Sequence, residues 1–414
     1  MVLTQNKALA APAWRIVPLA GVLGWVLDAF DFFVIVFLFD TLAQHFQVSK
    51  AAIVYTLTAT LAMRPLGAIL FGALSDAIGR KRPLMLCVLF FSTCTVLSGL
   101  AHTYGAFLIY RALYGIGMGG YWGVGASYVM ESSPPRFRGV LSGIIQAGYP
   151  VGYLLAAVVM QTLARSLGWK TAFFVGAPVA ILTLILTSLA PESDAWKEHR
   201  PQTSASVFHS MYVNRSMFAY LLLLMTVLIF LSHGSQDLYP DFLRTIPAIS
   251  SKSILGMDAD LGIPALFNIG AIAGALIFGA LSQRVGRRVA ILLALIVASI
   301  SIPGWAFGNS VATLSIGSFL MQIGVQGAFG VVPAHLNELS PPAARSLFAG
   351  SVYQMGVLLA SPGPALQFML RQLVGYRWAL TAFETSLIIL TMIIIWLGPE
   401  AKNRNFLSAA EEIA

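Results

Sequence analysis

Cysteine and charge are both scarce in this sequence, and each shortage excludes a class of protein. The two cysteines among 414 residues, Cys87 and Cys94, share one apolar stretch, which argues against a disulfide framework and a cysteine-based metal site. Charged residues make up only 10% of the chain, whereas soluble domains carry about 25%. No short apolar stretch with a cleavage site begins the chain, so no signal peptide is expected. The composition is not that of a soluble protein, and neither a metal nor a cofactor is expected.

Long apolar stretches are what the sequence has instead. A stretch of about 20 residues crosses the hydrocarbon core of a bilayer as a helix, and such stretches recur along the whole chain. Twelve lie near residues 16–39, 51–73, 83–101, 104–127, 139–161, 170–190, 217–239, 259–282, 288–308, 311–333, 346–370 and 377–397. The sequence therefore predicts an all-α membrane protein with twelve transmembrane helices.

The net charge of +8 follows membrane topology rather than a nucleic-acid surface. If both termini are cytoplasmic, 16 of the 25 lysines and arginines fall in segments on the cytoplasmic side and seven in external loops. The other two, Arg64 and Arg111, lie within spans. This bias is the positive-inside rule, so we expect both termini in the cytoplasm and no nucleic-acid partner.

The chain contains an internal duplication. When it is shifted by 207 residues, GALSDAIGRKR at 72–82 falls on GALSQRVGRRV at 279–289, and ESSPP at 131–135 falls on ELSPP at 338–342. We interpret this as two six-helix halves, 1–190 and 215–414, joined by a polar cytoplasmic linker at 191–214. Related halves that enclose a solute near the membrane midplane are typical of transporters.

The stretch at 72–82 resembles the signature between helices 2 and 3 of the major facilitator superfamily, and ESSPPRFRG after the fourth span strengthens the resemblance. The resemblance implies a monomer that works by alternating access, through rocking of its halves. On a tight, glycine-bearing loop, Asp76 with Arg80 and Lys81 can pair with the ends of neighbouring helices and hold one side shut. The predicted gating motif is Gly72, Asp76, Gly79, Arg80 and Lys81. The alternative is that its basic residues only anchor the topology.

A second glycine motif, GIGMGG at 115–120, matches the dinucleotide-binding pattern G-x-G-x-x-G. No strand precedes it, and the motif lies inside an apolar helix, so dinucleotide binding is not predicted. Gly115, Gly119 and Gly123 recur every four residues and instead predict close packing of this helix on a neighbour.

Ionisable residues within the spans are candidates for function, because a charge in a membrane needs a partner, a cavity or a proton. Asp28 and Asp31 share one face of the first span, and His233, Gln236 and Asp237 share one face of the seventh. The shift of 207 residues places Asp31 one residue from Asp237. The two halves thus present acids at equivalent positions, and all three aspartates are candidate proton sites.

A carboxylate solute would need a cation, and an arginine fork suits it by geometry. We predict that Arg111 binds it together with His233 and Gln236, while a coupling or structural role for Arg111 is the alternative. Arg64 is expected to anchor helix packing. Tyr121 and Tyr353 are predicted to line the cavity.

SHGSQDLYP at 232–240 resembles the seventh-helix signature of fungal lactate/pyruvate permeases, in the sialate:proton symporter family. The matching residues are Ser232, His233, Ser235, Gln236 and Asp237. The ends depart, because Ile229 and Asp241 stand where the signature has Asn and Thr. Pro240 is expected to end or kink the helix. GWVLDAFDFF at 24–33 also resembles the first helix of that family, whose members carry monocarboxylates or sialic acid.

Each of these functional roles has a purely structural alternative. His233 could bond a helix carbonyl, Asp237 could be its fixed partner, and the sequence does not say which of Asp28 and Asp31 carries a proton. Glu384 is expected at the wrong depth to take part.

We interpret the chain as a secondary active transporter of the cytoplasmic (inner) membrane, a proton-coupled symporter of a small monocarboxylate such as lactate or pyruvate. Sialic acid or another sugar acid is the second solute. Proton antiport stays open, whereas a transport-incompetent sensor and an enzyme are disfavoured, because no long signalling tail and no catalytic group at useful spacing is present.

Overall fold

The computed structural model describes residues 13–201, 203–247, 249, 252–254, 257–402, 404 and 406, and most of them are helical. The N-terminal half comprises α1 (Ala13–Phe37), α2 (Phe39–Phe46), α3 (Lys50–Ile78), α4 (Lys81–Leu100), α5 (Tyr104–Ser132), η1 (Pro135–Phe137), α6 (Arg138–Gln161), α7 (Leu163–Leu167), α8 (Thr171–Phe174) and α9 (Gly176–Leu189). Two linker helices follow, α10 (Asp194–Glu198) and α11 (Ser204–Val213).

The C-terminal half repeats this plan with a small hairpin added. Its elements are α12 (Arg215–Gln236), α13 (Tyr239–Arg244), β1 (Ser253–Ile254), β2 (Met257–Asp258), α14 (Ala259–Val285), α15 (Arg287–Phe307), α16 (Val311–Leu339), η2 (Pro342–Ala344), α17 (Arg345–Ala360), α18 (Gly363–Val374) and α19 (Tyr376–Leu397). β1 and β2 form an antiparallel pair. The all-α, twelve-helix class predicted from the sequence is confirmed.

Ten helices of the described chain are long and apolar enough to cross a membrane. The other two predicted spans do not meet this criterion of length and hydropathy, and their sequences show why. α5 has the length but carries many glycines and tyrosines, and α17 has only 16 residues. Position in the bundle, rather than hydropathy, makes these two helices part of the twelve.

Two predicted spans are broken rather than continuous. The span expected at 346–370 is divided into α17 and α18 at Ser361 and Pro362, because proline lacks the N–H that would continue the helix. The span expected at 217–239 ends at Gln236, and α13 restarts it with Pro240 in its first turn. The expectation for Pro240 is therefore confirmed, and the break leaves Asp237 and Leu238 at a helix end.

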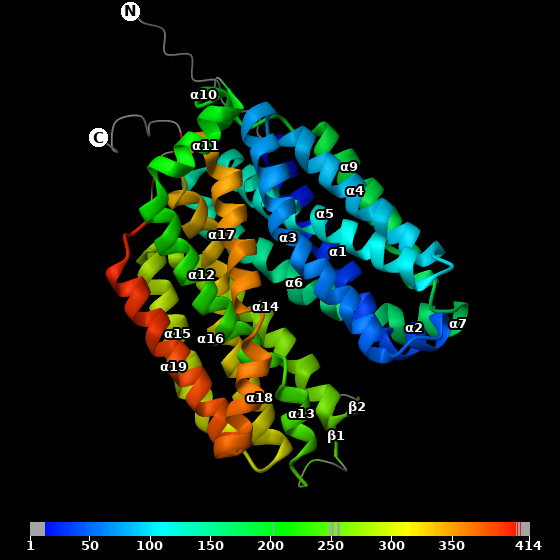
Figure 1. Ribbon diagram of the computed structural model, residues 1–414. Coiled ribbons are helices and arrows are strands. Elements are labelled where there is room, and N and C mark those ends of the chain that lie inside the picture. The colour runs from blue at the N-terminus through cyan, green and yellow to red at the C-terminus, as the bar shows by residue number, and fades with distance from the viewer. Residues whose placement is uncertain are drawn as a thin grey trace, which may run out of the picture.

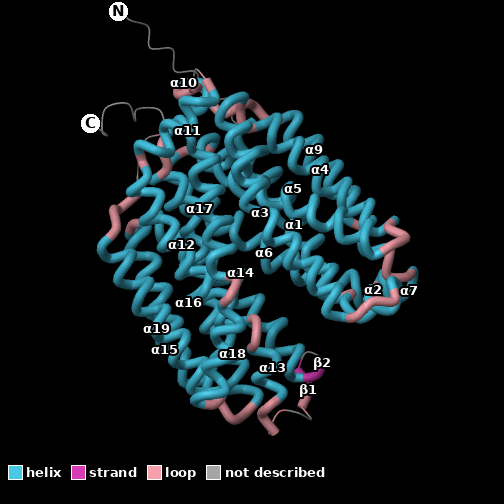
Figure 2. The backbone as a smooth tube through the Cα atoms, in the orientation of Figure 1, coloured by secondary structure: helices cyan, strands magenta, loops and turns pink. Residues whose placement is uncertain are grey.

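The two halves meet at one end of the bundle and diverge toward the other (Figures 1 and 2). We call the end that carries α10 and α11 the linker end, and the end near α2 and α13 the open end. Across the halves, α3 and α5 pack on α17, while α6 packs on α14 and α16.

Glycines permit the closest helix contacts, and they do so at duplicated positions. A Cβ on Gly72 of α3 would lie 2.7 Å from Cα of Leu347, and one on Gly279 of α14 would lie 2.6 Å from Cα of Gly143. Within the N-terminal half, a Cβ on Gly119 would lie 2.0 Å from the carbonyl oxygen of Arg64. The packing role predicted for the GIGMGG helix is thus confirmed, and this contact fixes the backbone at Arg64.

Candidate functional site

Two acids of α1 lie in a buried polar cluster of the N-terminal half. Tyr114 donates a hydrogen bond to the backbone carbonyl of Asp28 at 2.6 Å, and its hydroxyl lies 3.4 Å from Oδ1 of that residue. Thr95 donates to Oδ2 of Asp31 at 3.0 Å. Each aspartate keeps one carboxyl oxygen with no hydrogen-bond partner in the described chain. Such half-satisfied buried acids are costly structurally, which favours a role in function.

Arg111 belongs to this same cluster. It is fully buried, its guanidinium carbon lies 3.9 Å from the ring centroid of Tyr114, and it interacts electrostatically with Asp31. None of its three guanidinium nitrogens has a hydrogen-bond partner in the described chain. Arg111 thus lies with Tyr114 and Asp31, and its predicted role in solute binding with His233 and Gln236 stays a prediction.

Arg64, which the sequence-based prediction assigned to packing, is the arginine that lies between the halves. It interacts electrostatically with Asp28 and Tyr149 of the N-terminal half and with His233 and Tyr353 of the C-terminal half. It is 5% exposed, and its Nε has no hydrogen-bond partner in the described chain. The one signal in the sequence was its place as a charge within a span.

The polar face of α12 is arranged as its spacing predicts. Nδ1 of His233 lies 2.9 Å from Oδ2 of Asp237, and the amide of Gln236 donates to Oγ of Ser232 at 2.7 Å. The side chains of His233 and Asp237 are 39% and 37% exposed. They are thus accessible from the open end, unlike the acids of α1.

Two further amides, both from α16, complete this face. Gln326 donates to Oγ of Ser232 at 2.9 Å, and Gln322 donates to Oγ of Ser235 at 3.0 Å. Gln322 and Gln326 lie on α16, seven and eleven residues after Ser315, which is also buried. Serines and amides with spare acceptor and donor capacity are groups that can bind hydroxyls or a carboxylate.

The two tyrosines predicted to line the cavity have different environments. Tyr121 is buried and donates to the carbonyls of Ala20 and Gly21, at 3.2 and 3.0 Å, so it joins α5 to α1. The ring of Tyr353 stacks on Trp122 with centroids 4.0 Å apart. That stack joins α17 to α5 across the halves, close to Arg64.

At the linker end, the side chain of Asp76 accepts hydrogen bonds from the other half. Its Oδ1 accepts from the backbone N–H of Ser346 at 3.1 Å, and its Oδ2 accepts from that of Leu347 at 2.8 Å. These N–H groups belong to the first turn of α17, where the helix dipole favours a negative charge. Oγ of Ser75 lies 3.1 Å from Oγ of Ser346 beside them.

Arg80 and Glu131 extend this contact into a buried charge network. Arg80 pairs with Asp76, and its Nε and Nη2 donate to Glu131 at 2.9 and 2.7 Å. Arg345, from the other half, donates to the same carboxylate at 2.7 Å. Burial opposes the charge on Arg80, but Glu131 and Asp76 together raise its pKa above the usual value. Arg80 therefore stays charged at any physiological pH.

The remaining residues of the predicted gating motif stabilise their own half. Gly79 has φ of +113°, a left-handed conformation that favours glycine. Lys81 donates to the carbonyl of Ser188 at 2.6 Å, so it does not cross to the other half. Asp76 and Glu131 thus carry charged contacts between the halves here, while Gly72 permits the close approach of α3 to α17.

The duplicated loop repeats this arrangement with one change. Arg287 pairs with Glu338 at 2.8 Å, and Gln283, at the position equivalent to Asp76, accepts from the backbone N–H of Gly139 at 2.9 Å. Burial opposes ionisation of Glu400, yet the N–H groups of Arg287, Lys402, Arg288 and Ala401 donate to it and lower its pKa. At the position of Asp76, the second copy therefore bonds across the halves through a neutral amide.

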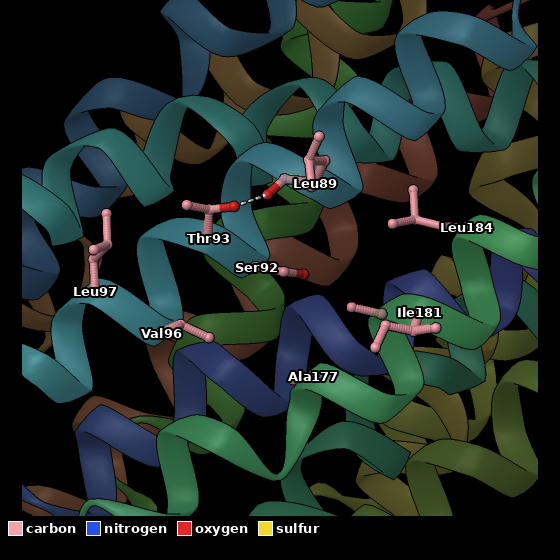
Figure 3. A pocket seen from close by; sticks show the side chains of 9 residues that line it. Leu89, Ser92, Thr93, Val96, Leu97, Ala177, Ile181 and Leu184 are labelled. Carbon is pink, nitrogen blue, oxygen red and sulfur yellow. Dashed lines mark hydrogen bonds between the residues drawn. The ribbon is translucent and has the colours of Figure 1, made fainter.

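One groove of the described chain lies elsewhere and is apolar. It has a volume of about 240 Å³ and lies between α4 and α9, as Figure 3 shows. Leu89 and Ile181 on its walls are exposed hydrophobic residues, which face lipid in a membrane. No group of His, Cys, Asp and Glu that could hold a metal occurs among the described residues.

Comparisons with known proteins agree with this architecture. Residues 22–265 match the family described as Major Facilitator Superfamily, and residues 251–409 match the family described as Sugar (and other) transporter. The chain is 29% identical to a carboxylic acid transporter protein homolog of Saccharomyces cerevisiae, over 94% of this chain and 68% of that protein. It is 27% identical to the sialic acid transporter NanX of Escherichia coli, over 93% of each.

The fold is shared with solved structures at lower identity. A crystal structure of a double-tryptophan mutant of XylE superposes with a TM-score of 0.76 at 20% identity, over 95% of this chain and 98% of that one. The first family match alone covers more than half of the chain. The protein belongs to the Major Facilitator Superfamily and is a membrane transporter, not an enzyme.

Proposed function

We propose that this transporter carries a small monocarboxylate, such as lactate or pyruvate, together with a proton. The observation that carries the proposal is the position of Arg64. It interacts electrostatically with His233 and Tyr353 of the other half, and each of the three side chains has an N–H or O–H that can donate to an anion. Alternating access requires the solute to touch both halves, and Arg64 of α3 and His233 of α12 satisfy that condition.

The acids near Arg64 provide the coupling in this proposal. Asp28 and Arg64 attract each other in the absence of solute. A solute carboxylate that binds Arg64 competes for the same positive charge, and Asp28 then loses part of the interaction that keeps it ionised. A buried acid that loses its cation takes up a proton. The anion and the proton therefore bind together. In this proposal, Arg111 holds Asp31 in position beside the binding site.

Asp237 is the second candidate proton site, and its environment differs from that of Asp28. It is paired with His233 and reachable from the open end. When the solute engages His233, the pair separates and Asp237 needs a proton to enter the closed cavity. The linker end is the cytoplasmic end in this proposal, and the protein works as a monomer in the inner membrane.

A sugar acid such as sialic acid is the alternative solute. The polar groups Ser232, Gln236 and Gln326, which form one hydrogen-bonded set, favour it because they suit a hydroxylated solute. The similarities to a carboxylic acid transporter homolog and to a sialic acid transporter support the carboxylate group common to both proposals. The chemical structure of the solute beyond its carboxylate is determined by the experiment below.

Uptake into proteoliposomes tests the proposal directly. Labelled L-lactate should accumulate under an inward proton gradient in wild type, while Asp237→Asn should lose accumulation but still exchange lactate across the membrane. Sialic acid is measured on the same vesicles. Accumulation of neither acid would contradict the carboxylate proposal, and accumulation under an outward gradient would replace symport with antiport.

A further inference from the structure

Glu384 of α19 is a buried acid to which the proposed mechanism gives no role. It is fully buried, and neither carboxyl oxygen has a hydrogen-bond partner in the described chain. The sequence placed it near the outer end of the last helix, at a depth that seemed wrong for function. The structure instead places it beside Gly234 of α12. In the chain, Gly234 stands between His233 and Ser235, two residues of the polar face of that helix.

The contact between Glu384 and α12 is close. A Cβ on Gly234 would lie 2.2 Å from Oε1 of Glu384 and 2.7 Å from the ring of Phe383. Gln367 of α18 donates to the carbonyl of Gly234 at 2.9 Å, and its own Oε1 has no hydrogen-bond partner in the described chain. The absence of a side chain at residue 234 is what lets the acid touch the helix that carries His233.

No cation neutralises Glu384. On α12, His233 is paired with Asp237, and on α18, Arg371 is paired with Asp241 at 2.8 Å. The only charged residues of α15 are at its linker end, Arg287 and Arg288, where both are hydrogen-bonded. On α19 itself, Arg377 donates to the carbonyl of Phe307. An ionised, unpaired carboxylate in a membrane interior is costly, so Glu384 holds a proton in this conformation.

A permanently neutral acid would give no advantage over glutamine, which has nearly the same shape. We propose that Glu384 is a further proton site, protonated while α12 packs on it and deprotonated when α12 moves away. The break after Gln236 frees the end of α12 to move relative to α19. The proton then passes to water at the exposed end, and the carboxylate is solvated. This inference rests on the proposed proton coupling and assigns it a site behind α12.

Proton counting in proteoliposomes tests this role. The ratio of protons to solute is measured with a pH-sensitive dye and labelled lactate for wild type, Glu384→Gln and Ser386→Ala. Ser386 is an exposed residue on the same helix and provides the matched control. We expect Glu384→Gln to keep lactate exchange within about threefold and to lower the ratio. An unchanged ratio and unchanged pH dependence of net uptake would overturn the proposal.

A measurement on wild type avoids dependence on how well the variant folds. Dicyclohexylcarbodiimide partitions into membranes and reacts with protonated carboxyl groups, and the product is located by mass spectrometry. The tryptic peptide 378–402 contains two acids, Glu384 and Glu400. Labelling of Glu384 that declines as pH rises, with Glu400 unlabelled, supports the proposal.

Labelling of Glu384 that is absent, or that does not change with pH, overturns the inference. The proposed function has its own readout in the same vesicles. If wild type moves no protons with any carboxylate, symport fails whatever the labelling shows. If wild type moves protons and Glu384→Gln does so equally, only the role of Glu384 fails.

Discussion

Arg64 and Arg111 have the same side chain in the same half, and their surroundings separate their roles. Arg111 contacts Tyr114 and the acids of α1, and it is fully buried. Arg64 has electrostatic neighbours on both sides of the boundary between the halves. We therefore propose that Arg64 binds the solute, because it interacts with both halves, and that Arg111 acts through Asp31.

We therefore predict that Arg64→Gln weakens lactate binding, while Arg111→Gln leaves binding within about threefold. A hydrogen bond to a charged group contributes about 1.5–3 kcal/mol, so Arg64→Gln should raise Kd by about tenfold or more. Arg111→Gln should instead lose gradient-driven accumulation. Isothermal titration in detergent gives the first quantity and vesicle uptake gives the second. Equal losses of binding in the two variants would contradict this division of roles.

The sequence was informative about which residues matter and less so about which of them meet. Helical spacing placed His233 and Asp237 on one face correctly, because both lie on the same continuous helix. It could not choose between Arg64 and Arg111, because that choice depends on how α3 and α5 rotate against other helices. The close approach of Gly119 to Arg64 fixes part of that rotation, and no local pattern reports it.

At the scale of elements, the N-terminus of α17 closes the linker end. Asp76 accepts two of its first backbone N–H groups, at 3.1 and 2.8 Å. These are charge-assisted hydrogen bonds between the two halves, and the helix dipole strengthens them. Because α3 and α17 belong to different halves, separating them at this end requires that all these bonds break.

The expected result of Asp76→Asn is a linker end that opens more often. The asparagine keeps the shape but loses the charge that binds Arg80 and the helix N-terminus. The reporter is Ser346→Cys in a chain that also carries Cys87→Ser and Cys94→Ser. Adding Asp76→Asn to this reporter chain should make the cysteine react with maleimide about tenfold faster, because the closed contact loses about 1.4 kcal/mol of stability.

Lys81→Gln is the control for that experiment, because Lys81 bonds to Ser188 of its own half and not to α17. Its labelling rate should equal that of the parent chain. A faster rate in Lys81→Gln alone, or no change in Asp76→Asn, would show that the contact with α17 does not hold this end closed.

Element boundaries were predicted best where hydropathy alone decides them. All twelve crossings appear near the expected positions, but the break at Ser361 and Pro362 was missed. Proline within an apolar run is compatible with a continuous, kinked helix in a membrane, so Pro362 and Pro364 did not by themselves predict a break. The helices α2 and α13 and the hairpin β1–β2 lie outside the spans, where hydropathy carries no signal.

At the scale of the whole molecule, the duplication is repeated in contacts as well as in residues. Arg80 with Glu131 is matched by Arg287 with Glu338, and both pairs are buried. The copies differ where Asp76 is matched by Gln283, so the side chain at this position is an acid in one contact and a neutral amide in the other. The asymmetry places the stronger contact between α3 and α17, and this contact should be the last to part when the halves rock.

A reversible cross-link at that contact tests whether transport requires the halves to separate there. Oγ atoms of Ser75 and Ser346 lie 3.1 Å apart, close enough for Ser75→Cys and Ser346→Cys to form a disulfide after a small adjustment. Oxidation should abolish both net uptake and exchange of lactate, and a reductant should restore them. Each single cysteine variant, treated in the same way, should transport normally. Since a disulfide joins α3 to α17 covalently, full transport in the cross-linked protein would mean that the linker end stays closed throughout the cycle, and rocking about this contact would be wrong.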